Sequence, residues 1–226
     1  MDILEIKQQQ TSSGYLHDYF CINGKPLYEY LNEWLSGISG PLQFILPTDD
    51  LAICWKNSFD FECDARFMKY VLEQKQGIMP ILSCPDDMDF SCIVLVADIV
   101  RQDDVVAWKR IGMIDHSKED KKAEELSGLA QYEKYTDEEW ELYGDGVINF
   151  TIGSDEWNNW LWSNHWREES YRRRINYTFP FYQDPNNTIW FADCNFSFDI
   201  NAYDMLIESC LRTFELWRDD HPVLVL

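Results

Sequence analysis

The chain has 226 residues, 46% of them hydrophobic and 15% aromatic, which is enough to bury one full-sized core without disulfides. It carries 40 acidic residues against 19 basic ones, a formal charge of −21. Such a surface repels phosphates and anionic lipids, so direct binding to nucleic acid or to a membrane is disfavoured. Two interpretations of the charge remain open: simple solubility, and attraction to a basic partner.

The first third of the chain predicts alternating short strands and helices. β-prone residues that end at the turn Asn23-Gly24 indicate a strand, and apolar residues at helical spacing indicate the helix that follows it. In chain order we expect a strand at 19–22, a helix at 26–36, short strands at 42–46 and 51–55, and a helix at 64–76.

The strongest β signal lies in the middle of the chain. Apolar runs at 78–83, 91–100 and 105–114 predict three strands, and residues 101–104 are the expected hairpin connection between the last two. These strands should form the centre of the sheet.

Residues 115–145 carry eleven acids against four lysines and few large aliphatic side chains. We interpret this region as an acidic, solvated excursion with one or two short helices. The alternative is a boundary between two lobes, because a strand-like run follows it at 147–152.

The last third predicts a long helix, a hairpin and a closing helix. Ser154 is a good N-cap for the long helix, and Asn201, with Asp204 at the capping-box spacing, is the expected cap of the closing one. The elements are a helix at 155–174, strands at 177–182 and 188–198, and a helix at 201–218. Together the patterns predict one α+β domain over 1–226, with a mainly antiparallel central sheet packed by about four helices.

The seven cysteines are an odd number, and several lie in apolar runs, which favours reduced, buried thiols. The N-terminal residues do not form a secretory signal, and no apolar stretch approaches the roughly 20 residues that span a bilayer. We therefore expect a cytoplasmic protein without a membrane segment.

No motif with a recognisable chemistry is present. The chain lacks zinc-finger cysteine spacing, a nucleophile elbow and the glycine-rich loops that bind phosphates. We expect no catalytic residue, no metal and no cofactor. One alternative is a hydrolase-type enzyme with a pocket between the sheet and the 115–145 excursion, and another is a scaffold or sensor domain.

Two groups of residues are candidates for partner binding. Asp86, Asp87 and Asp89 follow a proline beside a strong strand, which would hold three carboxylates together on a rigid support. On the helix expected at 155–174, Trp157, Trp160, Leu161 and Tyr171 share one side, whereas Trp162 and Trp166 lie near the other. That second ridge must meet another element, a partner or water.

The arginine triplet that ends the same helix has two interpretations. Arg173 lies seven residues beyond Trp166, so it can join the tryptophans in an anchor of the kind enriched at interfaces. As a group, Arg172, Arg173 and Arg174 are expected to cap the helix C-terminus and to pair with acids of the same chain.

Two segments carry a resemblance to a known class of protein. They are residues 21–31, Cys-Ile-Asn-Gly-Lys-Pro-Leu-Tyr-Glu-Tyr-Leu, and residues 80–114, which include Cys-Pro-Asp-Asp, Asp-Phe-Ser-Cys and Val-Ala-Trp-Lys-Arg-Ile-Gly. These segments resemble small bacterial cytoplasmic proteins, some of which are similar to immunity proteins of polymorphic toxin systems. The resemblance implies a non-enzymatic protein that binds and blocks a toxin domain, which agrees with an acidic chain that attracts a basic protein partner.

Overall fold

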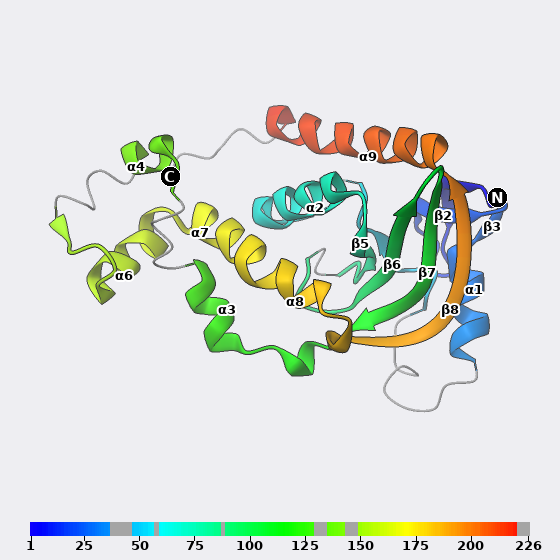
Figure 1. Cartoon of the computed structure of the whole chain (residues 1–226), viewed down its shortest axis with the longest axis horizontal. Coiled ribbons are helices and arrows are strands. Elements are labelled where there is room, and N and C mark those ends of the chain that lie inside the picture. The colour runs from blue at the N-terminus through cyan, green and yellow to red at the C-terminus, as the bar shows by residue number, and fades with distance from the viewer. Residues whose placement is uncertain (37–46, 57–58, 87–88, 129–134, 143–148, 221–226) are drawn as a thin grey trace.

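Five antiparallel strands form the central sheet, in the order β4-β5-β6-β7-β8 (Figure 1). The structure is a computed structural model that describes residues 1–36, 47–56, 59–86, 89–128, 135–142 and 149–220. The strands of this sheet are β4 (Ala52–Ile53), β5 (Gly77–Ser83), β6 (Val94–Gln102), β7 (Val105–Ile114) and β8 (Thr188–Asp199). The predicted α+β fold with an antiparallel sheet is confirmed.

The hairpin between β6 and β7 is tight because its two-residue turn suits the twist of the strands. Gln102 pairs with Val105, which leaves Asp103 and Asp104 as the loop, and Asp103 adopts φ +52°. Strand β8 then pairs with β7 over its whole length. Its register shifts twice, near Asn195, which adopts φ +52°, and between Trp190 and Ala192. Such bulges bend a strand, and Figure 1 shows β8 curving around the sheet.

A second, three-stranded sheet at the N-terminus is joined to the main core. It consists of β1 (Leu4–Gln10), β2 (Leu16–Ile22) and β3 (Lys25–Pro26), followed by α1 (Leu27–Leu35). Phe20 of β2 packs edge-on against Trp55 and Trp108, so the two sheets share one aromatic core. The predicted strand at 42–46 lies outside the described residues.

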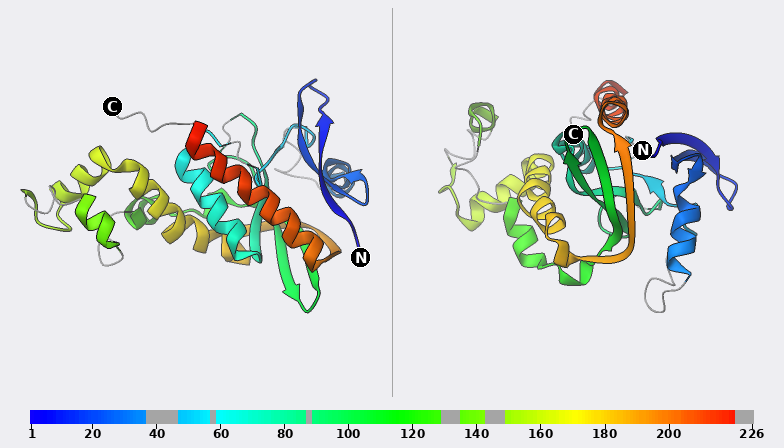
Figure 2. Two further views of the ribbon diagram at one scale, coloured as in Figure 1. Left: turned by 90° about the horizontal axis from the view of Figure 1, so that it is seen from above. Right: turned by 45° about the vertical axis from the view of Figure 1, so that its right-hand side comes forward.

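Most of the helices lie on the other side of the molecule from this small sheet. Figures 1 and 2 show α2 and α9 side by side, with α4 and α6 at the far end from the N-terminal strands. The helices are α2 (Glu62–Gln74), α3 (Lys121–Gly128), α4 (Asp137–Leu142), α6 (Asp155–Asn164), α7 (Trp166–Arg173), α8 (Phe179–Gln183) and α9 (Ile200–Asp220).

Three predictions about the last third are wrong. The helix expected at 155–174 is two helices, because the backbone leaves helical geometry at His165 (φ −132°, ψ 31°). Residues 177–182 are not a strand: the chain stays helical from α7 through a π-helical turn, Arg174–Thr178, into α8. Residues 149–152, the described part of the strand expected at 147–152, are not extended either.

The closing helix begins as expected but with a different cap. The Asp199 carboxylate accepts hydrogen bonds from the backbone N–H groups of Asn201 and Ala202. The predicted cap, Asn201, is therefore already inside the helix, and Asp204 pairs with Arg101 of β6. These contacts tie the start of α9 to the central sheet.

The excursion after β7 ends in a small helical unit with its own core. We call α4 and α6, with residues 135–136 and 149–154, the helical lobe. Its core contains Tyr135, Trp157 and Leu161, with Trp140, Phe150, Ile152 and Trp160 packed around them. This cluster is separate from the main core, and α7 leads from the lobe back to the sheet.

Candidate interaction site

Three consecutive arginines on and after α7 connect the lobe, the excursion and α2. The Arg174 Nε lies 2.7 Å from Asp64 Oδ1 of α2, and an Arg172 amino nitrogen lies 2.6 Å from Glu139 Oε1 of α4. Glu124 of α3 is within 3.9 Å of both Arg173 and Arg174. We call this group the arginine seam. The predicted intramolecular pairing is confirmed, and Arg172 and Arg173 lie in the last turn of α7 with Arg174 at its C-cap, although the chain continues into a π-helical turn.

The Asp64–Arg174 pair is the most buried contact of the seam. The Asp64 side chain is 1% exposed and that of Arg174 is 13% exposed. Burial raises the pKa of the Asp64 carboxyl above its ordinary value, and the neighbouring guanidinium offsets part of that effect. Removing Arg174 would leave the Asp64 carboxylate buried without its 2.7 Å partner, so the pair ties the end of α7 to α2.

Glu169 is a second buried acid, and it lies on α7 about one turn before the arginines. Its side chain is fully buried, and its Oε1 accepts a hydrogen bond of 3.1 Å from the Tyr135 hydroxyl. Burial raises the pKa of this carboxyl to about 7, and Arg172 acts in the opposite direction. Glu169 therefore links the core of the helical lobe to α7.

The two tryptophans of the predicted ridge lie on either side of the bend at His165. Trp162 is half-buried, with the Arg173 guanidinium 5.5 Å from its ring centroid. Trp166 is 46% exposed, and the guanidinium of Arg167 lies 5.5 Å from its ring centroid. We call these four residues the tryptophan elbow. The opposite side of α6 is buried as expected, since Trp157 and Leu161 are fully enclosed.

The acidic turn is less available than the sequence indicates. Asp86 is exposed, but the carboxylate of Asp89 accepts hydrogen bonds from the backbone N–H and the hydroxyl of Ser91. Asp87 lies outside the described residues. The charge of Asp89 also contributes to the raised pKa of Asp64, so this turn is an electrostatic neighbour of the arginine seam.

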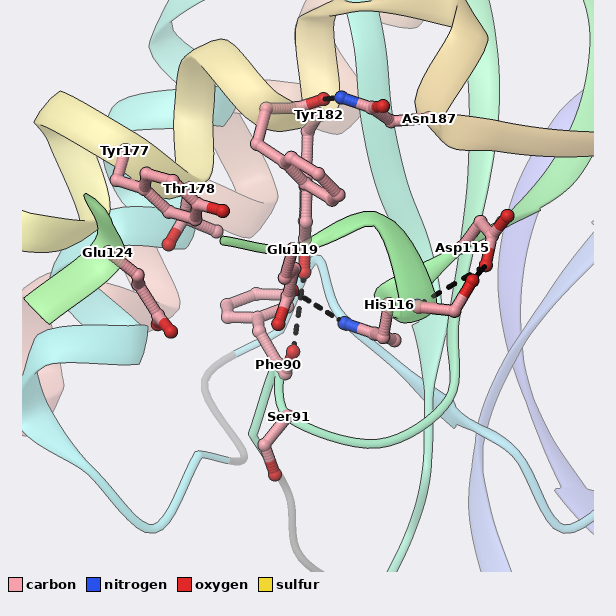
Figure 3. A network of polar contacts seen from close by, with 12 residues as sticks. Phe90, Ser91, Asp115, His116, Glu119, Glu124, Tyr177, Thr178, Tyr182 and Asn187 are labelled. Atoms are coloured by element: carbon pink, nitrogen blue, oxygen red, sulfur yellow. Dashed lines mark hydrogen bonds and ion pairs between the residues drawn. The ribbon is translucent and has the colours of Figure 1, made fainter. Parts of the chain in front are cut away.

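Next to that turn, polar contacts join the start of the excursion to the π-helical turn Arg174–Thr178, and join α8 to Phe90 (Figure 3). His116 Nδ1 lies 2.7 Å from Glu119 Oε1, and the Tyr177 hydroxyl accepts a 2.7 Å hydrogen bond from the Asp120 backbone N–H. The Tyr182 hydroxyl donates to the Phe90 carbonyl at 3.4 Å. The Ser91 hydroxyl is engaged by Asp89 instead of by this network. These contacts hold residues 115–120 and the segment that contains Phe90 against the helical residues 177–182.

Over the described ranges, no group of three or more His, Cys, Asp or Glu side chains is arranged to hold a metal ion. In the same part of the chain, no helix combines the length and the apolar character needed to cross a membrane. The structure shows no disulfide at any of the seven cysteines, all of which lie in the described ranges, and burial raises the pKa of Cys54 to about 12 and that of Cys63 to about 11.

Sequence reasoning missed the acidic half of the arginine seam. Asp64, Glu124 and Glu139 all lie in acid-rich stretches whose composition indicates exposed surface. Only the arginine triplet gave a signal, because consecutive cations on an acidic chain need nearby partners. Comparisons with protein-family models, curated proteins and solved structures find no match for this chain.

Proposed function

We propose that this protein acts by stoichiometric binding to a basic macromolecular partner, with the tryptophan elbow as its anchor. The observation that carries the proposal is Trp166, a large aromatic side chain that is 46% exposed at a bend between two helices of an acidic molecule. Tryptophan and arginine are the residue types most enriched among those that dominate binding energy at protein interfaces.

The basic side chains are largely used inside the molecule, which supports attraction to a basic partner. Lys25, Lys56, Arg101, Arg110 and the three arginines of the seam each pair with an acid of the same chain. The net charge of −21 is thus carried by acids in excess of these pairs. An acidic surface of this kind accelerates encounter with a cationic surface.

Exposed carboxylates lie near the ends of both helices of the lobe. Asp137, Glu138 and Glu141 of α4 and Asp155 and Glu156 of α6 are all exposed. These carboxylates add negative charge to the lobe that carries Trp162, which suits a cationic partner surface. The elbow is also connected to the seam, because Arg173 lies 5.5 Å from the Trp162 ring centroid and 3.9 Å from Glu124.

The proposed partner is a basic protein, and a toxin domain is the specific form that the sequence resemblance implies. In this form the protein would cover a cationic surface of the toxin and block it, without chemistry of its own. A reducing cytoplasm would be the compartment of such an encounter. Asp86 and the neighbouring Asp87 would steer association, and the tryptophan elbow would hold the complex.

The test is a kinetic measurement with a purified partner, taken from the neighbouring gene or from cross-linking in cells. Trp166→Ala should weaken binding by about 2 kcal/mol, mainly as a dissociation rate about thirtyfold higher. Asp86→Asn combined with Asp87→Asn should instead lower the association rate and flatten its dependence on salt. Met205→Ala, which removes another exposed apolar side chain on α9, is the matched control and should change neither rate.

Two results would contradict the proposal. If binding ignores salt and all of these substitutions, the anchor and the steering residues are wrongly assigned. If the purified protein turns over a small molecule at an enzymatic rate, stoichiometric binding is not its primary function.

A further inference from the structure

Glu169 lies where the helical lobe meets α7, and its two oxygens have different surroundings. Oε1 accepts the Tyr135 hydroxyl at 3.1 Å and lies 3.6 Å from Arg172 Nε. Oε2 is buried and has no hydrogen-bond partner within the described part of the protein. A fully buried carboxylate with one unpartnered oxygen is a high-energy arrangement when it is charged.

Groups from the lobe and from α7 act on the Glu169 carboxyl. The loop before α4 supplies Tyr135, α4 supplies Glu139, and α7 itself supplies Arg172. Packing is tight on the α3 side as well, because a Cβ added at Gly128 would lie 2.7 Å from the Glu169 carbonyl oxygen. The backbones of α3 and α7 are therefore in close contact at Glu169.

The charges around Glu169 balance only when it is neutral. The Arg172 guanidinium is already paired with Glu139 at 2.6 Å and lies 4.1 Å from the Tyr135 ring centroid. With Glu169 protonated, Arg172 and Glu139 form a one-to-one ion pair. With Glu169 ionised, two carboxylates share one guanidinium in a buried setting.

We propose that protonation of Glu169 controls the packing of the helical lobe against α7: the lobe is held closed when the carboxyl is neutral and loosens when it is ionised. The conformational part of this proposal does not depend on the proposed function. Its consequence for binding does, because α7 begins with Trp166 and the lobe ends at Asn164, so opening of the lobe alters the tryptophan elbow.

The direction of the pH dependence follows from linkage. The pKa of Glu169 is about 7 in the closed state, against 4.5 for a solvated glutamate, so the closed state binds the proton more tightly. The stabilisation of the closed state is complete below pH 4.5, decreases as pH rises, and is lost above pH 7. Between these values the ratio of open to closed lobe should rise by about tenfold per pH unit.

Hydrogen exchange between pH 5 and 8.5 tests the switch. Exchange rates of the α4 and α6 amides are measured for the wild type, Glu169→Gln and Glu168→Gln. At each pH the wild-type rate is divided by the rate of the variant, because this ratio cancels the intrinsic pH dependence of exchange. Glutamine imitates the neutral acid, so Glu169→Gln should keep the lobe closed, and the ratio to wild type should grow with pH up to about 7. Glu168→Gln makes the same charge change one residue away, and its ratio should stay constant.

A second variant keeps the proposal testable if the glutamine is poorly tolerated. Tyr135→Phe removes the hydrogen bond that favours the ionised carboxylate, so the opening transition should move to higher pH. The proposed switch would be wrong if the ratio of wild-type to Glu169→Gln exchange rates did not change with pH. It would also be wrong if Tyr135→Phe left the pH of the opening transition unchanged.

Binding is measured separately from exchange. If the exchange results are as expected, the dissociation rate of the basic partner should increase between pH 6 and 8 in the wild type but not in Glu169→Gln. If exchange shows the switch while the dissociation rate ignores it, the link to the tryptophan elbow is wrong and the conformational proposal stands. If exchange shows no switch, the proposal fails whatever the binding data show.

Discussion

The main core and the core of the helical lobe are both rich in tryptophan, but they satisfy their polar atoms differently. In the main core, Trp55 Nε1 donates to the Pro80 carbonyl and Trp108 Nε1 donates to the Tyr203 hydroxyl, each at 2.9 Å. In the lobe, the fully buried Trp157 has no partner for its Nε1 within the described ranges. Glu169, whose Oε2 also has no hydrogen-bond partner within those ranges, lies where α7 meets the lobe.

This difference indicates which part of the molecule is stable by itself. The main core is a continuous set of edge-to-face aromatic contacts that joins both sheets and α9. Among the described residues, the core of the lobe has three buried side chains, and ion pairs of the arginine seam connect the lobe to the rest of the molecule. We therefore expect the sheet to be the stable scaffold and the lobe to open first.

The largest expected effect comes from removing one tryptophan from each core. Trp108→Ala should lower the free energy of unfolding by about 3–5 kcal/mol, because it leaves a large cavity and takes the donor from Tyr203. Trp157→Ala should change the main unfolding transition by only about 1 kcal/mol and should accelerate limited proteolysis at residues 149–164. Denaturant melts and timed proteolysis measure the two effects. Equal losses of global stability would mean that the two cores unfold as one.

The next effect tests the seam that joins the two regions. Arg174→Met should destabilise the protein by about 3 kcal/mol, because it leaves Asp64 buried without its counter-charge. Asp64→Asn in the same background should recover part of the loss, since the uncompensated charge is then gone. Arg212→Met, on the exposed side of α9, is the control and should change stability by about 0.5 kcal/mol or less. A loss no larger than that of the control would show that the seam does not hold α7.

The central sheet was predictable because its signals are local. The turn at Asp103 and Asp104 and the apolar runs on both sides define the β6–β7 hairpin without help from the rest of the chain. Helix α2 was also predicted, as a helix at 64–76 that stops before Gly77; it spans Glu62–Gln74 and ends at Lys75, which is in the left-handed conformation.

The errors fall where distant residues override local preference. Residues 177–182 are aromatic and β-prone, yet they are helical. The helix buries Tyr182, whose hydroxyl donates a hydrogen bond to the carbonyl of Phe90, 92 residues away. The bend at His165 was missed since nothing in its neighbourhood breaks a helix, and its ring packs on Trp160 at 4.9 Å. The buried partner of Arg174 is 110 residues away, so no pattern in one segment reveals it.

A smaller effect separates binding from folding at the tryptophan elbow. Trp166→Ala should reduce stability by about 1 kcal/mol at most, because almost half of the side chain is already in water. Trp162→Ala should cost more, since its half-buried ring also contacts Arg173. Thermal melts of both variants check this order. If Trp166→Ala unfolds the protein, the residue is structural and its loss of binding carries no information about a partner.

The smallest expected effect contrasts the pH response of the scaffold with that of the lobe. The Arg101 guanidinium donates to both oxygens of Asp204, at 2.9 and 2.8 Å, and lowers the pKa of that carboxyl below its ordinary value of 3.8. A lowered pKa means that this contribution is complete above pH 3.8 and is lost as the pH falls through the folded-state value. The sign is therefore opposite to that of Glu169, whose contribution is lost as pH rises.

Because the Asp204 side chain is 29% exposed, solvent screens the pair, and we expect Asp204→Asn to destabilise the protein by only about 0.5–1 kcal/mol at neutral pH. The difference from the wild type should shrink towards zero in acid, while Glu208→Gln, an exposed change on the same helix, should show no such trend. Urea melts at a series of pH values from 7 down to 2 measure both. A difference that stays constant over this range would mean that Asp204 stabilises α9 through packing and not through its charge. The scaffold would then have no acid-sensitive contact at this position to set against the alkali-sensitive lobe.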